Sequence, residues 1–111
     1  MFFSKKKSWT KVADNINDLA FGNREIIIVE IGEQKICIGR QPKGYIAFAQ
    51  RCPHAGASME YGFIDDKGNI GCSQHGIKFS CKNGRDMDDQ AYRLKIWEVD
   101  VRNDGVFVAL D

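Results

Sequence analysis

Both histidines of this chain follow a cysteine at short spacing, in two separate segments. The first segment reads C-x-H from Cys52 to His54, and the second reads C-x-x-H from Cys72 to His75, with 17 residues between them. Thiolate and imidazole groups are ligands for zinc, copper and iron–sulfur clusters. The sequence therefore predicts a metal centre that is held by these four residues.

The distribution of the four candidate ligands between the two segments indicates which metal centre they would hold. A structural zinc site usually takes like ligands in pairs, with two cysteines from one segment and two histidines from the other. Here each short segment supplies one cysteine and one histidine. This alternation favours a binuclear iron–sulfur centre, in which each segment gives one ligand to each iron. On the ligand types alone, a zinc site is the alternative.

The composition excludes several other classes of protein. The chain has 111 residues, and 16 Lys and Arg against 15 Asp and Glu give a formal net charge of +1. This balance argues against a nucleic-acid-binding protein, which usually carries a strong basic excess. Because there are only two histidines, any site that needs three is excluded. No G-x-G-x-x-G fingerprint for a dinucleotide is present.

The N-terminal residues carry no targeting signal. Only two phenylalanines precede the run Lys5–Lys7, and no stretch approaches the roughly 20 apolar residues of a membrane-spanning helix. We therefore expect a cytoplasmic protein with no membrane partner, in which thiols stay reduced. Residues 1–8 are expected to form a tail, and residues 9–111 a single domain.

Short runs of β-branched and aromatic residues, separated by turn signals, predict the elements that position the ligands. Two segments rich in small residues, 52–62 and 71–76, contain both histidines and are expected to be loops. About nine short strands and no helical period predict an all-β fold, an antiparallel sandwich. The segment Lys82–Gly84 is expected to form a hairpin turn. The clearest predicted strands are Trp9–Ala13, Glu25–Ile31, Gln34–Gly39, Tyr45–Gln50, Ile70–Cys72, Leu94–Val101 and Val106–Leu110.

Beyond the ligands, the chain resembles the Rieske [2Fe–2S] ferredoxin family over nearly its whole length. The resemblance is carried by CPHAGAS at 52–58, CSQHGIKF at 72–79 and KNGR at 82–85. It implies an antiparallel β sandwich with a small cluster-binding subdomain of two loops, and one Rieske cluster per chain. It also implies that Cys52 and Cys72 ligate the buried iron, and that His54 and His75 ligate the outer iron through Nδ1.

The residues around the two loops predict a low reduction potential. Two thiolates and two neutral imidazoles leave the oxidised site uncharged, which places Rieske centres at about −150 to +300 mV, above plant-type ferredoxins near −400 mV. High-potential relatives have a disulfide between the loops and two hydroxyl donors after the second histidine. Ala57, Gln74, Ile77 and Phe79 take those positions here. We therefore expect a potential nearer −150 mV than +300 mV.

The other candidate residues have plainer expected roles. Cys37 and Cys81 are expected to be free thiols, the first a packing residue. Gly56 and Gly76 are expected either to bring N–H groups to the cluster sulfurs or only to form turns. The acidic residues near the loops are expected to form a solvated face, with steering of a basic partner as the alternative. These acidic residues are Glu60, Asp65, Asp66, Asp86, Asp88 and Asp89.

The resemblance implies a one-electron carrier that passes electrons from a flavin- or NAD(P)H-dependent reductase to a terminal oxygenase or a similar enzyme. We expect no catalytic site, because a Rieske oxygenase also needs a mononuclear iron held by two histidines and a carboxylate. Both histidines are already assigned to the cluster. The small subunit of an assimilatory NAD(P)H nitrite reductase is the alternative within electron transfer. A zinc-stabilised binding module is the alternative of another class.

Overall fold

The computed structural model describes residues 8–54, 56–74, 76–88 and 91–110. Within these ranges the chain forms nine strands in two antiparallel sheets, of six strands in the order β1-β9-β8-β4-β3-β2 and three in the order β5-β6-β7. No helix in these ranges is long and apolar enough to cross a membrane. The elements are β1 (Trp9–Ala13), η1 (Ile16–Asp18), β2 (Ile26–Ile31), β3 (Gln34–Gln41), β4 (Gly44–Ala49), η2 (Met59–Tyr61), β5 (Phe63–Ile64), β6 (Ile70–Gly71), β7 (Lys78–Phe79), β8 (Ile96–Arg102) and β9 (Gly105–Ala109).

The large sheet curls and separates two hydrophobic cores. Successive side chains of a strand point to opposite faces, so Ile36 and Ile38 of β3 pack into one core and Cys37 into the other. The terminal core holds Ile36 and Ile38 together with Val106 and Val108 of β9. The loop core holds Cys37 together with the small sheet. The alternation of apolar residues in the central strands therefore serves two cores at once.

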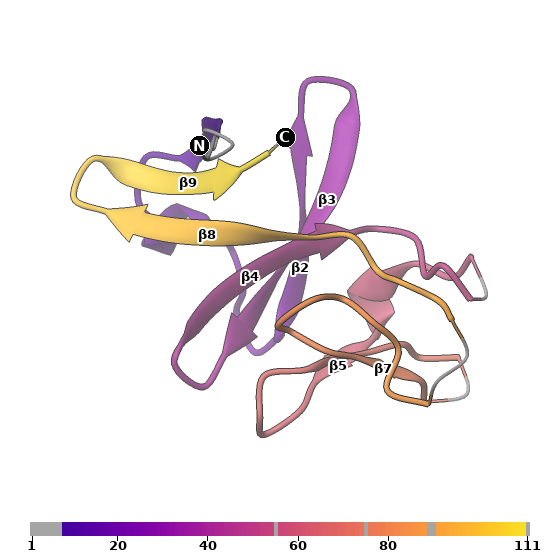
Figure 1. Ribbon diagram of the computed structural model, residues 1–111. Coiled ribbons are helices and arrows are strands. Elements are labelled where there is room, and N and C mark those ends of the chain that lie inside the picture. Colours follow the sequence, from indigo (N-terminus) through magenta and orange to yellow (C-terminus); the bar gives the residue numbers. More distant parts are fainter. Residues whose placement is uncertain (1–7, 55, 75, 89–90, 111) are drawn as a thin grey trace, which may run out of the picture.

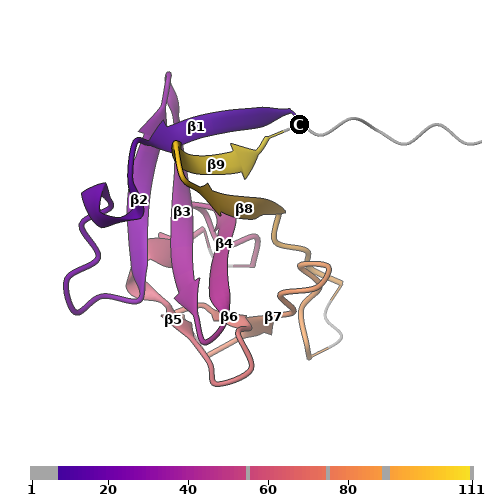
Figure 2. The same ribbon diagram turned by 90° about the vertical axis from the view of Figure 1, so that its left-hand side faces the viewer.

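The small sheet lies beneath the lower ends of β2, β3 and β4, and the loops around it extend to one side of the molecule (Figures 1 and 2). Strands β1 and β9 lie at the other end, where Trp9 pairs with Ala109. The loop core fills the space between the sheets with buried side chains such as Phe48, Ile70 and Phe79. The predicted loop segments are thus attached to a packed base.

Strands β5 and β6 approach each other closely at the root of the second predicted loop. A Cβ atom on Gly62 would lie 2.0 Å from the carbonyl oxygen of Gly71, and a Cβ on Gly71 would lie 2.1 Å from the Phe63 ring. Only glycine leaves room for such an approach. Because Gly71 directly precedes Cys72, this contact fixes where the second loop begins.

The predicted all-β fold is confirmed, as a curled antiparallel sheet with a small second sheet. The predicted strand Trp9–Ala13 has the observed bounds of β1, and the other predicted strands shift by one or two residues at their ends. Sequence patterns do not predict β5 and β7, because two residues are too few to show an alternation. The tail predicted for residues 1–8 falls mostly outside the described residues.

The turn predicted at Lys82–Gly84 forms, since the N–H of Ser80 donates to the carbonyl of Arg85 at 2.8 Å. The residues directly after it form only isolated bridges, of Arg85 with Arg93 and of Asp86 with Phe79, and the next strand is β8. The physical reason is the side chain of Asp86, which accepts the backbone N–H groups of Asp88 at 2.7 Å and Tyr92 at 3.4 Å. A side chain that binds the backbone in this way competes with regular strand pairing.

Candidate metal centre

The two predicted ligand loops are closed in the same way. In the first loop the N–H of Cys52 donates to the carbonyl of Ala57 at 2.9 Å. In the second loop the N–H of Cys72 donates to the carbonyl of Ile77 at 2.8 Å. Each cysteine is thus bonded to the residue five positions later, and the two loops present their cysteines from equivalent turns.

A glycine stands four residues after each of these cysteines. Gly56 and Gly76 have φ angles of 69° and 65°, in the left-handed region that glycine enters at little cost. The N–H of Gly56 donates to the carbonyl of Cys52 at 2.8 Å, so Gly56 forms a turn, which is one of its two expected roles. The shared glycine position is a second mark of the equivalence of the loops.

The side chains of Cys52 and Cys72 meet inside the loop core. Their exposed fractions are 2% and 0%, and both pack in this one core. The backbone N–H of Gln74 donates to Sγ of Cys72 at 3.4 Å. Burial raises the pKa of the Cys72 thiol against the effect of that N–H group, and contact with Cys52 raises the pKa further. Two of the four predicted ligands are therefore brought together in a shielded place.

His54, the third predicted ligand, is half-buried, and its Nδ1 atom is shielded from solvent. Its ring stands edge to face with the ring of Tyr92, at a centroid distance of 5.0 Å and an interplanar angle of 87°. His75 lies outside the described residues. Among the described residues no three His, Cys, Asp or Glu side chains converge on one point. A binuclear centre does not require such convergence, because its cysteines and histidines bind different irons.

A third loop, residues 84–94, reaches His54 from a later part of the chain. Its base is held by the N–H of Leu94, which donates to the carbonyl of Gly84 at 2.8 Å. A Cβ on Gly84, whose φ is 77°, would lie 1.9 Å from the carbonyl oxygen of Leu94, so only glycine fits this base. Sequence reasoning missed this loop, because nothing in its composition indicates that Tyr92 lies against His54.

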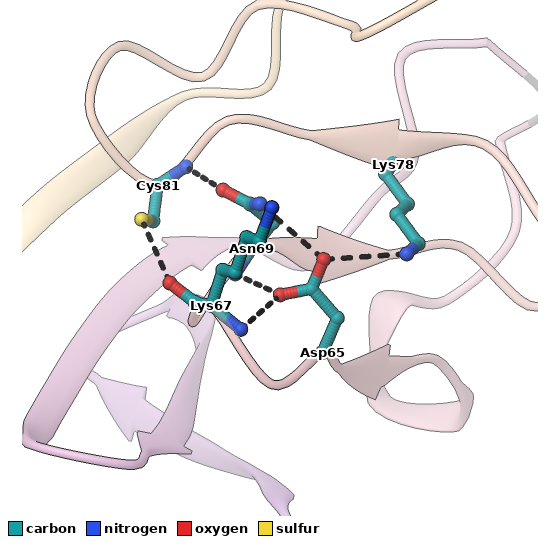
Figure 3. A network of polar contacts seen from close by, with 5 residues as sticks. All are labelled: Asp65, Lys67, Asn69, Lys78 and Cys81. Atoms are coloured by element: carbon teal, nitrogen blue, oxygen red, sulfur yellow. Dashed lines mark hydrogen bonds and ion pairs between the residues drawn. The ribbon is translucent and has the colours of Figure 1, made fainter.

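A network of polar contacts braces the second ligand loop between β6 and β7 (Figure 3). One carboxylate oxygen of Asp65 accepts the N–H groups of Lys67 at 2.9 Å and Asn69 at 2.8 Å. The other carboxylate oxygen pairs with Nζ of Lys78 at 3.3 Å. Oδ1 of the buried Asn69 accepts the N–H of Cys81 at 3.1 Å. The network therefore joins residues on both sides of the second loop.

The acidic residues near the loops are only in part the solvated face predicted from the sequence. Asp86 is 7% exposed and binds backbone inside the third loop, and Asp65 is held in the network just described. Glu60 pairs with Arg24 at 3.1 Å. Asp66 and Asp88 are exposed, and Asp89 lies outside the described residues. The prediction was wrong for Asp86, because a short acidic side chain can satisfy buried N–H groups within its own loop.

The remaining two cysteines do not reach this site. Cys37 is fully buried in the loop core, and burial raises the pKa of its thiol to about 12. Cys81 is half-buried at the edge of that core, and its Sγ lies 3.9 Å from the carbonyl oxygen of Lys67. The packing role predicted for Cys37 is confirmed, and both thiols are free of disulfides.

Two apolar side chains flank the second loop where high-potential relatives carry hydroxyl groups. Ile77 is 4% exposed and Phe79 is fully buried, and both pack in the loop core with Cys72. Neither side chain has a hydrogen to donate to sulfur. The surroundings of Cys72 on this side are therefore apolar.

The donor set suits a cationic metal cluster. The buried Cys72 thiol has a raised pKa, and a bound cation is what favours the thiolate form of such a group. The N–H of Gln74 beside Cys72 is a contact of the kind that supports a ligating sulfur. The imidazole of His54 adds a nitrogen donor whose Nδ1 faces away from solvent. The residues present therefore fit a centre that takes both sulfur and nitrogen ligands.

A model of the Rieske [2Fe-2S] domain matches residues 8–98. This is most of the chain, so the protein belongs to the Rieske [2Fe–2S] family, and its cofactor is a Rieske-type [2Fe–2S] cluster. The family resemblance predicted from the two loops is confirmed, and a zinc site is set aside. The family supports an electron-transfer role for the domain.

Similar proteins include both small and large ones. Over 54 residues the chain is 37% identical to the vanillate O-demethylase oxygenase subunit of Pseudomonas sp. (strain HR199 / DSM 7063), a match that covers 48% of this chain and only 15% of that protein. A chain in a complex of reduced oxygenase and oxidised ferredoxin in carbazole 1,9a-dioxygenase is 28% identical, with a TM-score of 0.69 and 94% of each chain covered. A Mycobacterium tuberculosis protein named as an NADH-dependent nitrite reductase small subunit has a TM-score of 0.77 at 20% identity, with 96% of this chain and 98% of that chain covered.

Proposed function

We propose that this protein is a one-electron carrier that accepts electrons from a flavin- or NAD(P)H-dependent reductase and passes them to a terminal oxygenase. The observation that carries the proposal is the pair of buried cysteines, Cys52 and Cys72, which pack in one core and begin two equivalent loops. When bound, the cluster supplies one-electron redox chemistry. The match in length to a chain of an oxygenase–ferredoxin complex supports a carrier of this size.

In this proposal Cys52 and Cys72 hold the inner iron, and His54 and His75 hold the outer iron. The loop core excludes water from the two sulfurs, and the network at Asp65 holds the ends of the second loop. His54 is half-buried, so its ring joins the shielded interior to the surface on which a redox partner would dock. Contacts between redox partners are characteristically small and transient.

We further propose that residues 9–111 form one domain without a catalytic centre. Rieske domains also occur in oxygenase catalytic subunits, and the vanillate O-demethylase relative is an oxygenase subunit. A non-haem iron centre of that class needs two histidines and a carboxylate. These 111 residues contain two histidines, and the cluster takes both. The cytoplasmic location predicted from the sequence stays a prediction.

The alternative role is that of a small subunit of a nitrite reductase, and the similarity in fold to a protein of that name supports it. The two roles differ in the lifetime of the complex. A carrier exchanges between partners, whereas a fixed subunit copurifies with its large subunit. Size-exclusion chromatography of the chain with a nitrite reductase large subunit, and separately with an oxygenase, distinguishes the two roles.

Iron and sulfide analysis tests the site itself. We expect two irons and two sulfides per chain, a red-brown colour and a reduced electron paramagnetic resonance signal of the Rieske type. His54→Ala and His75→Ala should each lose this signal, because each removes a ligand to the outer iron. Cys81→Ser is the matched control and should keep the signal. A normal Rieske signal in either histidine variant would contradict the ligand assignment.

A further inference from the structure

Tyr92 contacts His54, and the proposed function assigns no role to this tyrosine. Its ring stands at 87° to the imidazole with the centroids 5.0 Å apart, which is the edge-to-face arrangement that aromatic rings prefer. Tyr92 is 37% exposed, so the contact lies at the boundary between the loop core and solvent. The contact therefore places a partly exposed aromatic ring against the ring of the proposed ligand.

The chain holds Tyr92 in this place with a buried carboxylate. The N–H of Asp86 donates to the carbonyl of Tyr92 at 3.0 Å, and Oδ2 of Asp86 accepts the N–H of Tyr92 at 3.4 Å. Both backbone groups of Tyr92 are therefore bound by one residue, which is itself only 7% exposed. The position of the tyrosine is set by the backbone and does not depend on its own side chain.

Ala91, which precedes Tyr92, has a φ of 65° and is the one non-glycine residue with a positive φ in the described part of the chain. For a residue with a Cβ this left-handed conformation is strained. Strain of this kind persists only where the surrounding structure imposes it, and it gathers at functional sites. The third loop accepts it at the position that turns Tyr92 toward His54.

We propose that Tyr92 is a positioning residue that fixes the ring plane of His54, and that Asp86 in turn positions Tyr92. The inference rests on the proposed function, in which His54 is a ligand through Nδ1. The outer torsion of a histidine side chain is broad and roughly two-fold, so the backbone alone does not decide which ring atom faces inward. A perpendicular ring on one side hinders the flip that would exchange Nδ1 for carbon.

A ligand ring that is held in one orientation should release iron slowly and give a narrow spectrum. Removal of the tyrosine ring allows the imidazole to rotate, so the bond to the outer iron is broken more often. Aromatic edge-to-face pairs correspond to a factor of roughly 2 to 10 in an equilibrium or a rate. We therefore expect Tyr92→Leu to speed iron release by roughly that factor and to broaden the reduced signal.

The experiment compares three variants of the cluster-loaded protein. Iron release to a chelator and the reduced electron paramagnetic resonance spectrum are measured for Tyr92→Leu, Tyr92→Phe and Tyr61→Leu. Tyr92→Phe keeps the ring and should match the wild type. Tyr61→Leu makes the same chemical change at a tyrosine of the same subdomain that is 71% exposed, and it should also match. Tyr92→Met replaces the leucine variant if the latter does not fold.

The outcomes separate the inference from the function on which it rests. If the wild-type chain binds the cluster and Tyr92→Leu or Tyr92→Met behaves as the wild type does, the role of Tyr92 is overturned. The proposed function is then unaffected. Equal acceleration in Tyr92→Leu and Tyr61→Leu also overturns the role of Tyr92, because the effect is then not specific to the contact with His54. A wild-type chain that binds no iron and sulfide overturns the proposed function, and the inference with it.

Discussion

At the scale of the residue, the site consists of candidate metal ligands and of neighbouring residues that position them. Cys52 and Cys72 could be predicted from the sequence, because thiolate and imidazole at short spacing indicate metal binding whatever the fold. Tyr92 and Asp86 could not, because their importance comes from a loop that folds back on His54. An exposed tyrosine and a buried aspartate have no sequence pattern that separates them from ordinary surface residues.

The apolar neighbours of Cys72 lead to a prediction about the reduction potential. The side chains of Ile77 and Phe79 have no donor for a hydrogen bond to sulfur. We therefore expect a midpoint nearer −150 mV than +300 mV, at the low end of the range of about −150 to +300 mV for Rieske centres. Ile77→Ser and Phe79→Tyr should each raise the potential, by up to about 100 mV, since an added donor stabilises the reduced and more negative form. Spectroelectrochemical titration measures this.

Ile36→Val is the control for these two variants. It should leave the reduction potential unchanged, because Ile36 packs in the terminal core and not in the loop core. A wild-type midpoint reduction potential above 0 mV on that scale would contradict the assignment to the low-potential class. An unchanged potential in both hydroxyl variants would show that Ile77 and Phe79 do not set it.

At the scale of the element, the loops are held by contacts that no sequence pattern shows. Strands β5 and β7 have two residues each, and their positions come from the close approach of Gly62 to Gly71 and from the Asp65 network. Long strands such as β3 could be predicted, because eight residues show an alternation. Short strands could not, because tertiary contacts outweigh the propensity of so few residues.

The Asp65 network leads to a prediction about pH. Burial alone would raise the pKa of this carboxyl, but the hydrogen bonds from Asn69 and Lys67 and the ammonium of Lys78 outweigh it and hold the pKa below the usual 3.8. A carboxyl with a lowered pKa stabilises the fold fully above its unfolded pKa, and the contribution is lost as the pH falls through the folded pKa. Asp65→Asn should therefore lower the unfolding temperature by a few degrees at neutral pH.

The difference between wild type and Asp65→Asn should be constant above about pH 5 and should close below about pH 4. Thermal unfolding followed by circular dichroism at a series of pH values measures it. Asp66→Asn, at the exposed neighbouring position, is the matched control and should track the wild type throughout. If the difference in unfolding temperature grew as the pH fell, the predicted direction of the pH dependence would be wrong. Asp65 would then not stabilise the fold as a carboxylate.

At the scale of the whole molecule, one curled sheet supports two cores of different purpose. In the terminal core, η1 and the strands β1, β8 and β9 pack against β2, β3 and β4 of the same sheet, and the loop core carries the cysteines. Sequence alternation predicts that the central strands are buried on both faces. It does not predict how the sheet curls, because curvature depends on the twist of neighbouring strands that are distant in sequence.

The two cores lead to a prediction about the four cysteines of the chain. In the cluster-loaded protein a small alkylating reagent at pH 8 should modify Cys81 alone, because Cys37 is fully buried and has a pKa near 12. Cys52 and Cys72 should be protected by the metal and by burial. Mass spectrometry of the intact protein counts the added groups, and Cys81→Ser should reduce the count to zero. Rapid modification of Cys37 would show that the loop core opens.

The pairing of β1 with β9 brings the two ends of the fold together, at the side of the molecule away from the ligand loops (Figure 1). A longer polypeptide can enter and leave such a unit through one seam, since close termini at the surface make a domain easy to insert or append. The same architecture can therefore serve as a separate shuttle or as a built-in part of a much longer enzyme. The matched relatives fit this expectation, since the similar region is 15% of one relative's chain and 94% of another's.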